Sequence, residues 1–461
     1  MALLRTLCTF VAGLGLLQGV HAGLDLSSNS TVVVYWGQNS FRGTGNLAQQ
    51  RLGYYCDGEY SYKFWPLDEY SMRWDGVIIL AFLMTINGPG GAPEIDFASA
   101  TEKCEVFPGT NLKNCPDLAT DIPKCQSSQK TILLSIGGAT YSEGGFPSKP
   151  AAEASADLLW ATFGPEQAGN NAHRPFGKAV IDGFDFDFEA AVSNTGAFAT
   201  RMRALMDADT SKRFYLTAAP QCPFPDAADK DILNTDASAA IDAVFVQFYN
   251  NYCGVNAFVP ERVARKRILA KKAQTNFNFQ TWDNWALTSS KNSDVRVFLG
   301  VPANTGAAST GYLPVSQLQP IISYVKKFES FGGVMMWDVT QAYGNQGFLG
   351  GVRAALGKGG VTQQPQQPLQ GQQGQGQGQP TAITMSTMSV AMAMASVTAM
   401  YTPAPAPGAQ EEDGTEAGEQ QANQQGEDSD SDSDQPSLLD LIPSILDPAG
   451  DLPLGDLPFG L

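Results

Sequence analysis

Eight short apolar runs, whose starts lie 29 to 54 residues apart, constrain the fold of this chain more than any other feature. The runs are rich in β-branched and aromatic residues and are bounded by Gly, Pro, Asn or Asp, which is typical of buried strands. Their spacing is too long for hairpins, but it leaves room for a crossover helix after each strand. The expected strands lie at 31–37, 76–83, 130–138, 181–189, 213–221, 242–249, 296–303 and 332–339.

Eight strand–helix units predict an α/β fold, a (β/α)8 barrel of the TIM type, over residues 23–357. Near-continuous apolar runs fit strands that are buried on both faces, and the length of this region fits such a barrel with some long loops. A doubly wound open sheet is the structural alternative. It is less favoured because no glycine-rich phosphate-binding motif follows the first expected strand.

Residues 1–22 have the pattern of a secretory signal peptide. A short basic start ends at Arg5, an apolar run covers 7–17, and residues 20–22 form a small-x-small cleavage site. A run this short does not span a bilayer, so a signal anchor is the less favoured interpretation. We therefore expect a secreted, extracellular protein whose mature chain begins near Gly23.

Cysteines and one sequon fit this route. The first cysteine of the chain leaves with the signal peptide, and an even number in an oxidising compartment predicts three disulfides. Fifteen pairings are open from the sequence alone. The sequon at Asn29 predicts an N-glycan. The cysteines that remain are Cys56, Cys104, Cys115, Cys125, Cys222 and Cys253.

Residues 358–461 differ in composition from the rest of the chain and predict a disordered tail. The tail is Gln/Gly/Pro-rich at 363–380, Ser/Thr-rich at 381–402 and acidic at 411–434, and none of these stretches can bury a core. The segment 381–402 is uncharged, but its eight Ser and Thr residues favour an O-glycosylated stalk over a membrane span. Acidic residues interrupt the last apolar segment, which argues against a lipid anchor. The tail remains a candidate for association with the cell wall.

The charge distribution excludes several classes of function. No Lys or Arg follows Lys358, so residues 1–358 carry 29 basic and 32 acidic side chains, a net charge of −3, and the tail carries −14. No basic face is available for nucleic acid. The chain has only two histidines, His21 and His173, so a His-rich zinc site cannot form. We expect neither a metal nor a cofactor.

The clearest chemical signal is the sequence DGFDFDFE at 182–189. Side chains alternate between the faces of a strand, so Asp185, Asp187 and Glu189 share one face and the phenylalanines share the other. Barrel enzymes keep their active sites at the carboxyl ends of strands, which is where this row lies. Repulsion among the carboxyls should keep at least one neutral near pH 7, and a neutral carboxylic acid is a general acid. Asp182 has an odd offset from the row and is interpreted as structural.

Two other interpretations of this row remain open at this point. One is a solvated acidic face, which is less favoured because burying three like charges without a purpose costs several kcal/mol. The other is a divalent-metal site, which no histidine supports.

The row matches the DxxDxDxE signature of glycoside hydrolase family 18, the chitinases, and the chain resembles that family over residues 30–355. The sequence SIGG at 135–138 resembles the SxGG motif of the same family. Four further segments resemble the plant and fungal class III branch, and they lie at 35–39, 216–226, 247–251 and 332–337.

The resemblance implies a role for each matching residue. Glu189 would protonate the glycosidic oxygen, Asp187 would orient the N-acetyl group of the substrate, and Asp185 would share a proton with Asp187. Tyr249 would hydrogen-bond the reacting acetamido group. The residues implied in substrate binding are Tyr35, Gln38, Gln247 and Trp337.

The resemblance also implies three disulfides, Cys56–Cys125, Cys104–Cys115 and Cys222–Cys253. Met84 departs from the pattern of the plant relatives, which have a polar subsite residue at its position.

The function that these observations favour is a secreted endochitinase. It would cut β-1,4 links between N-acetylglucosamine units of chitin or chito-oligosaccharides, with retention and with the substrate's own acetamido group as nucleophile. One alternative is an endo-β-N-acetylglucosaminidase that acts on N-glycan cores by the same chemistry. Another is a catalytically dead lectin or inhibitor, but such proteins typically lose the acid that Glu189 supplies here.

Overall fold

A computed structural model describes residues 23–56, 76–260, 274 and 276–358 of the 461-residue chain. Residues 1–367 form one compact unit, and residues 368–461 form a second unit that lies outside the described residues. The predictions of a signal peptide and of a disordered tail also fall outside this description. No helix among the described residues is long and apolar enough to cross a membrane.

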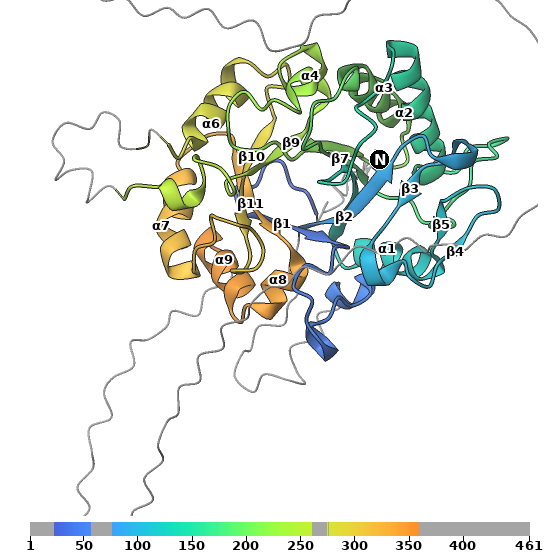
Figure 1. Ribbon diagram of the computed structural model, residues 1–461. Helices are drawn as coiled ribbons and strands as arrows, with labels where there is room; N and C mark the ends of the chain where they lie inside the picture. The colour runs from blue at the N-terminus through green and yellow to red at the C-terminus, as the bar shows by residue number, and fades with distance from the viewer. Residues whose placement is uncertain (1–22, 57–75, 261–273, 275, 359–461) are drawn as a thin grey trace, which may run out of the picture. The chain divides into compact units, whose positions relative to one another are not determined.

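Eight parallel strands form the closed barrel at the centre of Figure 1. β1 pairs with β2 on one side and with β11 on the other, and these two pairings close the sheet. The (β/α)8 fold expected from the apolar runs is therefore confirmed. The barrel strands are β1 (Thr31–Trp36), β2 (Gly76–Thr85), β6 (Lys130–Gly137), β7 (Gly183–Asp187), β8 (Tyr215–Ala218), β9 (Ala243–Gln247), β10 (Arg296–Pro302) and β11 (Phe331–Trp337).

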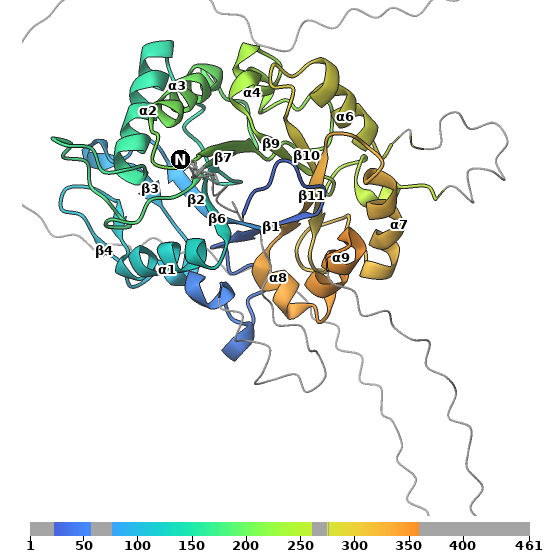
Figure 2. The ribbon, with the colours of Figure 1, turned by 180° about the vertical axis from the view of Figure 1, so that it is seen from behind.

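Helices ring the barrel, as Figures 1 and 2 show from opposite sides. They are α1 (Pro116–Ser127), α2 (Lys149–Phe163), α3 (Thr195–Ala208), α4 (Lys230–Leu233), α6 (Phe279–Thr288), α7 (Val315–Val325), α8 (Val339–Gly344) and α9 (Phe348–Leu356). A long excursion between β2 and α1 holds three short strands, β3 (Glu94–Ile95), β4 (Glu105–Val106) and β5 (Lys113–Asn114).

The alternation of side chains along the strands divides the core into two layers. On β7, Phe184 and Phe186 point outward, where their rings lie 6.3 Å from the ring of Phe163 on α2 and 5.8 Å from that of Phe198 on α3. Residues that point inward fill the barrel with a second buried cluster. This inner cluster includes Val33, Ile79, Leu133, Phe245 and Phe298.

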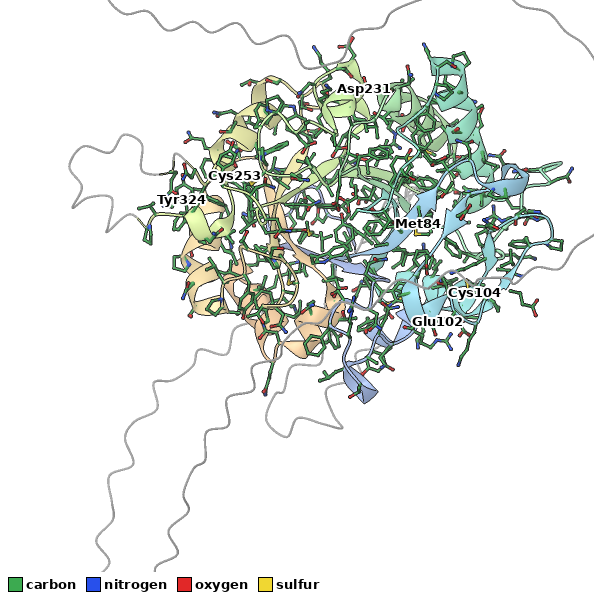
Figure 3. All side chains as sticks on the ribbon, in the orientation of Figure 1. Met84, Glu102, Cys104, Asp231, Cys253 and Tyr324 are labelled. Atoms are coloured by element: carbon green, nitrogen blue, oxygen red, sulfur yellow. A yellow bond between two sulfur atoms is a disulfide. The ribbon has the colours of Figure 1, made fainter. Side chains whose placement is uncertain are left out.

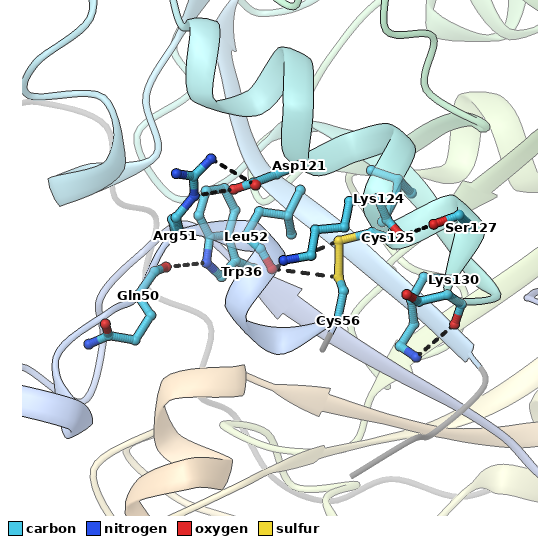
Figure 4. The surroundings of a disulfide bond; sticks show 12 residues. Trp36, Gln50, Arg51, Leu52, Cys56, Asp121, Lys124, Cys125, Ser127 and Lys130 are labelled. Atoms are coloured by element: carbon cyan, nitrogen blue, oxygen red, sulfur yellow. Dashed lines mark hydrogen bonds and ion pairs between the residues drawn. A yellow bond between two sulfur atoms is a disulfide. The ribbon is translucent and has the colours of Figure 1, made fainter. Parts of the chain in front are cut away.

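Three disulfides join segments outside the barrel sheet, in the pairing that the resemblance implies: Cys56–Cys125, Cys104–Cys115 and Cys222–Cys253. Figure 4 shows the first, which joins the end of the 3-10 helix η2 (Leu52–Tyr55) to α1. Beside it, the guanidinium of Arg51 donates two bonds of 2.9 Å to the carboxylate of Asp121, a bidentate geometry that fixes the same two segments.

Asp182 and Asn29 both lie at the amino-terminal end of the barrel strands, away from the carboxyl ends. Asp182 accepts hydrogen bonds from the backbone N–H of Ile132 at 2.8 Å and from Nζ of Lys212 at 2.6 Å, so it joins β6 to β7. Asn29 is exposed just before β1.

Candidate active site

Asp185 is the deepest carboxyl of the row and is fully buried inside the barrel. Three hydroxyl groups from three other strands donate to it: Ser135 at 2.8 Å and Thr217 at 2.6 Å from the adjacent strands β6 and β8, and Tyr35 at 2.8 Å from β1. Burial raises the pKa of Asp185, and the hydroxyls of Thr217, Tyr35 and Ser135 oppose that rise. Among the buried carboxyls of the row, Asp185 is thus the one best able to carry a negative charge.

Asp187 is the last residue of β7 and is also buried. Burial raises its pKa well above the usual range, and the neighbouring carboxyls of Glu189 and Asp185 raise it further. The side-chain amide of Gln247 is the single hydrogen-bond partner of its carboxyl among the described residues, and donates to Oδ1 at 2.9 Å. Like-charged neighbours thus add to the rise in the pKa of Asp187, whereas hydroxyl donors oppose the rise in the pKa of Asp185.

Glu189 lies two residues beyond the end of β7, so the strand is shorter than the predicted 181–189. Its side chain lies at the mouth of the barrel and is exposed to solvent. It also lines a concave surface, which removes part of its hydration. This partial desolvation raises the pKa of Glu189. The row therefore runs from a buried carboxyl that can hold a charge to an accessible one that can release a proton.

A cavity of about 270 Å³ lies above the row. Six of the residues named from the sequence meet in its wall, and Asp185 lies beneath them. Gln38 is the exception, because its amide donates to the carbonyl of Ala81 at 2.9 Å and the side chain does not line this cavity. The six are Asp187, Glu189, Tyr35, Gln247, Tyr249 and Trp337.

Aromatic rings form the apolar part of the site. The ring of Trp337 lies 5.3 Å from that of Tyr35 and stacks on Phe82 at 6.0 Å. Met84, labelled in Figure 3, packs against the same cluster, so the position that is polar in plant relatives extends an apolar surface here. Burial raises the pKa of Tyr249 well above its usual range, and the carboxyls of Asp187 and Glu189 raise it further, so its hydroxyl remains a hydrogen-bond donor.

Three residues with amide side chains in the cavity wall, Gln221, Asn250 and Asn251, are not among the site residues predicted from the sequence. Gln221 follows β8 and Asn251 follows β9, and Nδ2 of Asn251 donates to Oε1 of Gln221 at 2.8 Å. The carboxyl of Asp226 fixes this loop by accepting from the backbone N–H groups of Gln221, Ala228 and Asp229. The segments at 216–226 and 247–251 contain most of these residues, but no periodicity in either segment indicates that they touch.

Asp229 is a second omission, and its environment is unusual. Its side chain is fully buried, and neither carboxyl oxygen has a hydrogen-bond partner among the described residues. Burial raises its pKa well above the usual range, and the nearby carboxyls of Asp226, Asp187 and Asp185 add to the rise. Burial and like-charged neighbours therefore both favour the protonated form of Asp229.

In the described part of the chain, no group of three His, Cys, Asp or Glu side chains has the arrangement of a metal site. The cavity combines an accessible carboxyl and a buried carboxyl, both with raised pKa values, and aromatic walls. Paired carboxyls beside aromatic rings suit the cleavage of a glycosidic bond.

A barrel with this row of carboxyls defines a glycoside hydrolase, and comparison with known proteins identifies the family. The sequence model described as "Glycosyl hydrolases family 18" matches residues 31–312. The chain belongs to this family, as its DxxDxDxE signature predicts.

Named fungal relatives are similar over most of this chain. It is 44% identical over 360 residues to a class III chitinase of Arthroderma benhamiae, which covers 78% of this chain and 95% of the relative. It is 42% identical over 336 residues to endochitinase 33 of Trichoderma harzianum, at 73% and 94% coverage.

Solved structures show the same barrel. A xylanase and α-amylase inhibitor protein from Scadoxus multiflorus is 29% identical, with a TM-score of 0.53 over 72% of this chain and 99% of that one. The chitinase ICChI from Ipomoea carnea is 25% identical, with a TM-score of 0.52 over 71% and 100%. The fold therefore supports an enzyme in one relative and an inhibitor in another, so the function of this chain must be argued from its site.

Proposed function

We propose that this protein is a secreted endochitinase that hydrolyses β-1,4 links between N-acetylglucosamine units with retention of configuration. The carrying observation is the asymmetry of the carboxyl row. Asp185 is ringed by three hydroxyl donors, Asp187 is buried with a strongly raised pKa, and Glu189 is accessible with a raised pKa. An inhibitor or lectin would need no such gradient, whereas an acid catalyst does.

The nucleophile is the acetamido oxygen of the substrate. An ordinary retaining glycosidase needs a second carboxylate about 5 to 5.5 Å away across the bond, and family 18 is a named exception to this rule. In the described cavity wall the only carboxyls are Asp187 and Glu189, which lie two residues apart on one segment. A carboxyl on the same segment lies beside Glu189 and cannot face it across the sugar ring.

The reaction then follows from the positions of the side chains. Glu189 donates its proton to the glycosidic oxygen while the acetamido oxygen attacks the anomeric carbon, so the leaving sugar departs and a cyclic oxazolinium forms. Asp187 accepts the acetamido N–H, and the hydroxyl of Tyr249 donates to the reacting group. Water next attacks the anomeric carbon, with Glu189 as the base that takes its proton, and two inversions give net retention.

Asp185 acts through Asp187 and not on the sugar. As positive charge develops on the oxazolinium, Asp187 becomes a better stabiliser if its proton moves to Asp185. The three hydroxyls around Asp185 donate to its carboxyl and favour its ionised form, so before the reaction Asp185 is the member of the pair that is able to accept this proton.

Trp337 supplies the floor of the subsite beneath the reacting sugar, with Tyr35 and Gln247 beside it. Its ring is held by stacking on Phe82 and by the contact with Tyr35, so little side-chain entropy is lost when a sugar binds. Gln38 contributes indirectly, because its bond to the Ala81 carbonyl fixes the part of β2 that directly precedes Phe82, whose ring stacks on Trp337.

Secretion is part of the proposal, supported by the pattern of residues 1–22 and by three disulfides, which persist in oxidising compartments. An N-glycan at the exposed Asn29 and an association of the tail with a cell wall belong to the same proposal. Amino-terminal sequencing and glycosidase treatment of protein from the culture medium test cleavage before Gly23 and the glycan.

Colloidal chitin and a high-mannose glycopeptide, offered separately, test the activity. We expect the protein to release soluble oligosaccharides from chitin and to leave the glycopeptide intact. Cleavage of the glycopeptide core with no action on chitin would assign the site to an endo-β-N-acetylglucosaminidase. Binding of chitin without cleavage of either substrate would assign it to a lectin.

A further inference from the structure

Tyr252 is the most exposed large apolar side chain in the described part of the chain, at 65% of its full accessible area, and the only aromatic among the exposed ones. No described ring or hydrogen-bonding group contacts its side chain. Single apolar residues on a surface are common, so exposure alone gives no function. The place of this ring and the rigidity of its loop are what distinguish it.

The loop that carries Tyr252 forms part of the wall of the cavity. Asn250 and Asn251, which directly precede it, both line the cavity. Tyr252 is three residues beyond Tyr249, so their Cα atoms are at most about 11 Å apart. Tyr252 therefore lies close to the cavity, within the length of a bound saccharide chain.

Four contacts fix this loop. Cys253, labelled in Figure 3, is joined to Cys222, and the backbone N–H of Gly254 donates to the carbonyl of Asn251 at 3.1 Å across a turn. Asn250 is held from the other side, because its N–H donates to the carbonyl of Thr310 at 3.2 Å and its Oδ1 accepts from the N–H of Thr310 at 3.1 Å. The backbone on both sides of Tyr252 is thus fixed before any ligand binds.

The cavity is small, so a long saccharide chain must extend beyond it, where the exposed ring of Tyr252 can contact it. A volume of about 270 Å³ is at the lower end of the range for one small ligand. A polymer of sugar rings must continue past the rim when one of its rings is bound inside. A pyranose ring offers a flat apolar face of C–H groups, and tyrosine offers a large rigid ring with little rotamer entropy to lose.

We propose that Tyr252 is a stacking platform for a sugar ring outside the cavity, and that it gives the site an additional subsite for long chains. The inference rests on the proposed function and names a substrate preference within it. Because the platform contacts the chain beyond the reacting sugar, it contributes to binding and not to bond cleavage. Tyr252 is therefore a specificity-determining residue and has no part in proton transfer.

Tyr252→Ala and Tyr252→Phe, assayed on N-acetylglucosamine oligomers of increasing length and on colloidal chitin, test the platform. For Tyr252→Ala we expect kcat/KM to fall about three- to tenfold on hexamer and polymer, mainly through KM, and to stay unchanged on the shortest oligomer that the enzyme cuts. Tyr252→Phe should retain wild-type values because the ring remains. Leu287→Ala, an equally apolar change at an exposed position on α6, is the matched control and should have no effect.

Two results would overturn the platform. One is wild-type kcat/KM for Tyr252→Ala on every length, and the other is an equal loss on short and long oligomers, which would assign the residue to the fold of the loop. Wild-type protein that cuts no chitin substrate at all would contradict the proposed function and the platform together. An active wild type with an indifferent Tyr252→Ala would contradict the platform alone.

Discussion

The side-chain amide of Gln247 donates a hydrogen bond of 2.9 Å to Oδ1 of Asp187 and leaves Oδ2 of that carboxyl without a partner among the described residues. Gln247 is the last residue of β9 and Asp187 the last of β7, so the bond reaches across β8 between them. A second bond, from the same Nε2 to the carbonyl of Ala219 at 2.9 Å, fixes the amide. One oxygen of Asp187 is thus anchored while the other is free for the acetamido group of a substrate.

Glu189→Gln should lower turnover by at least about a hundredfold and leave the melting temperature unchanged. Glutamine keeps the volume of the side chain but has no proton to transfer, and acid–base catalysis contributes about 10² to 10⁴ in rate. Steady-state hydrolysis of a chito-oligosaccharide together with calorimetry checks both parts. Glu102→Gln makes the same change at an exposed position that does not line the cavity, so this control variant should behave as wild type. Turnover within about tenfold of wild type would remove Glu189 from the role of acid.

Thr217→Val should move the acidic limb of the pH profile of kcat/KM upward by about one pH unit. The Thr217 hydroxyl donates to Asp185 and holds its pKa down against the effect of burial. Without that donor the pKa of Asp185 rises, so the carboxyl ionises only at higher pH. The control is Thr162→Val, a buried threonine of α2 whose hydroxyl donates only to the backbone carbonyl of Leu158. An acidic limb that stays in place or moves down would show that the charge of Asp185 is not needed.

Asp229→Asn should stabilise the protein, and the gain should grow with pH. A carboxyl with a raised pKa in the folded state holds its proton above pH 4, where the unfolded chain has lost it. The folded state then binds more protons than the unfolded state, so wild-type stability falls as pH rises from the unfolded value toward the folded one. Melting temperatures of wild type and variant should nearly coincide at pH 4 and separate by pH 8.

The exposed Asp294 gives the control for this prediction, because Asp294→Asn removes a carboxyl that water already solvates. Its difference from wild type should not vary with pH in this range. If Asp229→Asn is less stable than wild type at pH 8, Asp229 is ionised in the folded protein and has a partner that the described residues do not include.

Truncation after Lys358 should leave the melting temperature and the activity on soluble oligosaccharides nearly unchanged. The tail has no composition that could pack a core, and its net charge of −14 favours solvation. Calorimetry and kinetics of the two proteins side by side make the comparison. A truncated protein that melts many degrees lower would place the end of the folded domain beyond Lys358.

Much of this fold is predictable because most barrel strands are nearly continuous apolar runs, while β7 alternates phenylalanine with aspartate. The face of β7 on which each side chain lies also follows from the sequence. Alternation alone brings Asp185, Asp187 and Glu189 into one row and places the phenylalanines of the strand in the outer layer. What alternation cannot supply is contact between loops. The bond between Gln221 and Asn251 joins residues that are 30 positions apart in irregular segments, and no pattern in either segment marks the pair.

The burial of Asp229 is a second feature that the sequence does not predict. In the stretch 226–231 it is one of three aspartates, a composition typical of a solvated loop. Only the packing of this loop against the barrel reveals that Asp226 caps backbone N–H groups, that Asp229 is buried, and that Asp231 accepts from the N–H of Gly196 at the start of α3. The burial of a polar side chain is decided by tertiary contacts, which local sequence does not contain.

The central claim is that the substrate's own acetamido group is the nucleophile. Partially deacetylated chitosan tests it directly, because only a sugar that carries an acetamido group can be attacked from within. The products of exhaustive digestion would be sequenced by mass spectrometry, and the sugar at each new reducing end would be identified. The account predicts N-acetylglucosamine at every new reducing end. Glucosamine at those ends as often as in the starting polymer would contradict it.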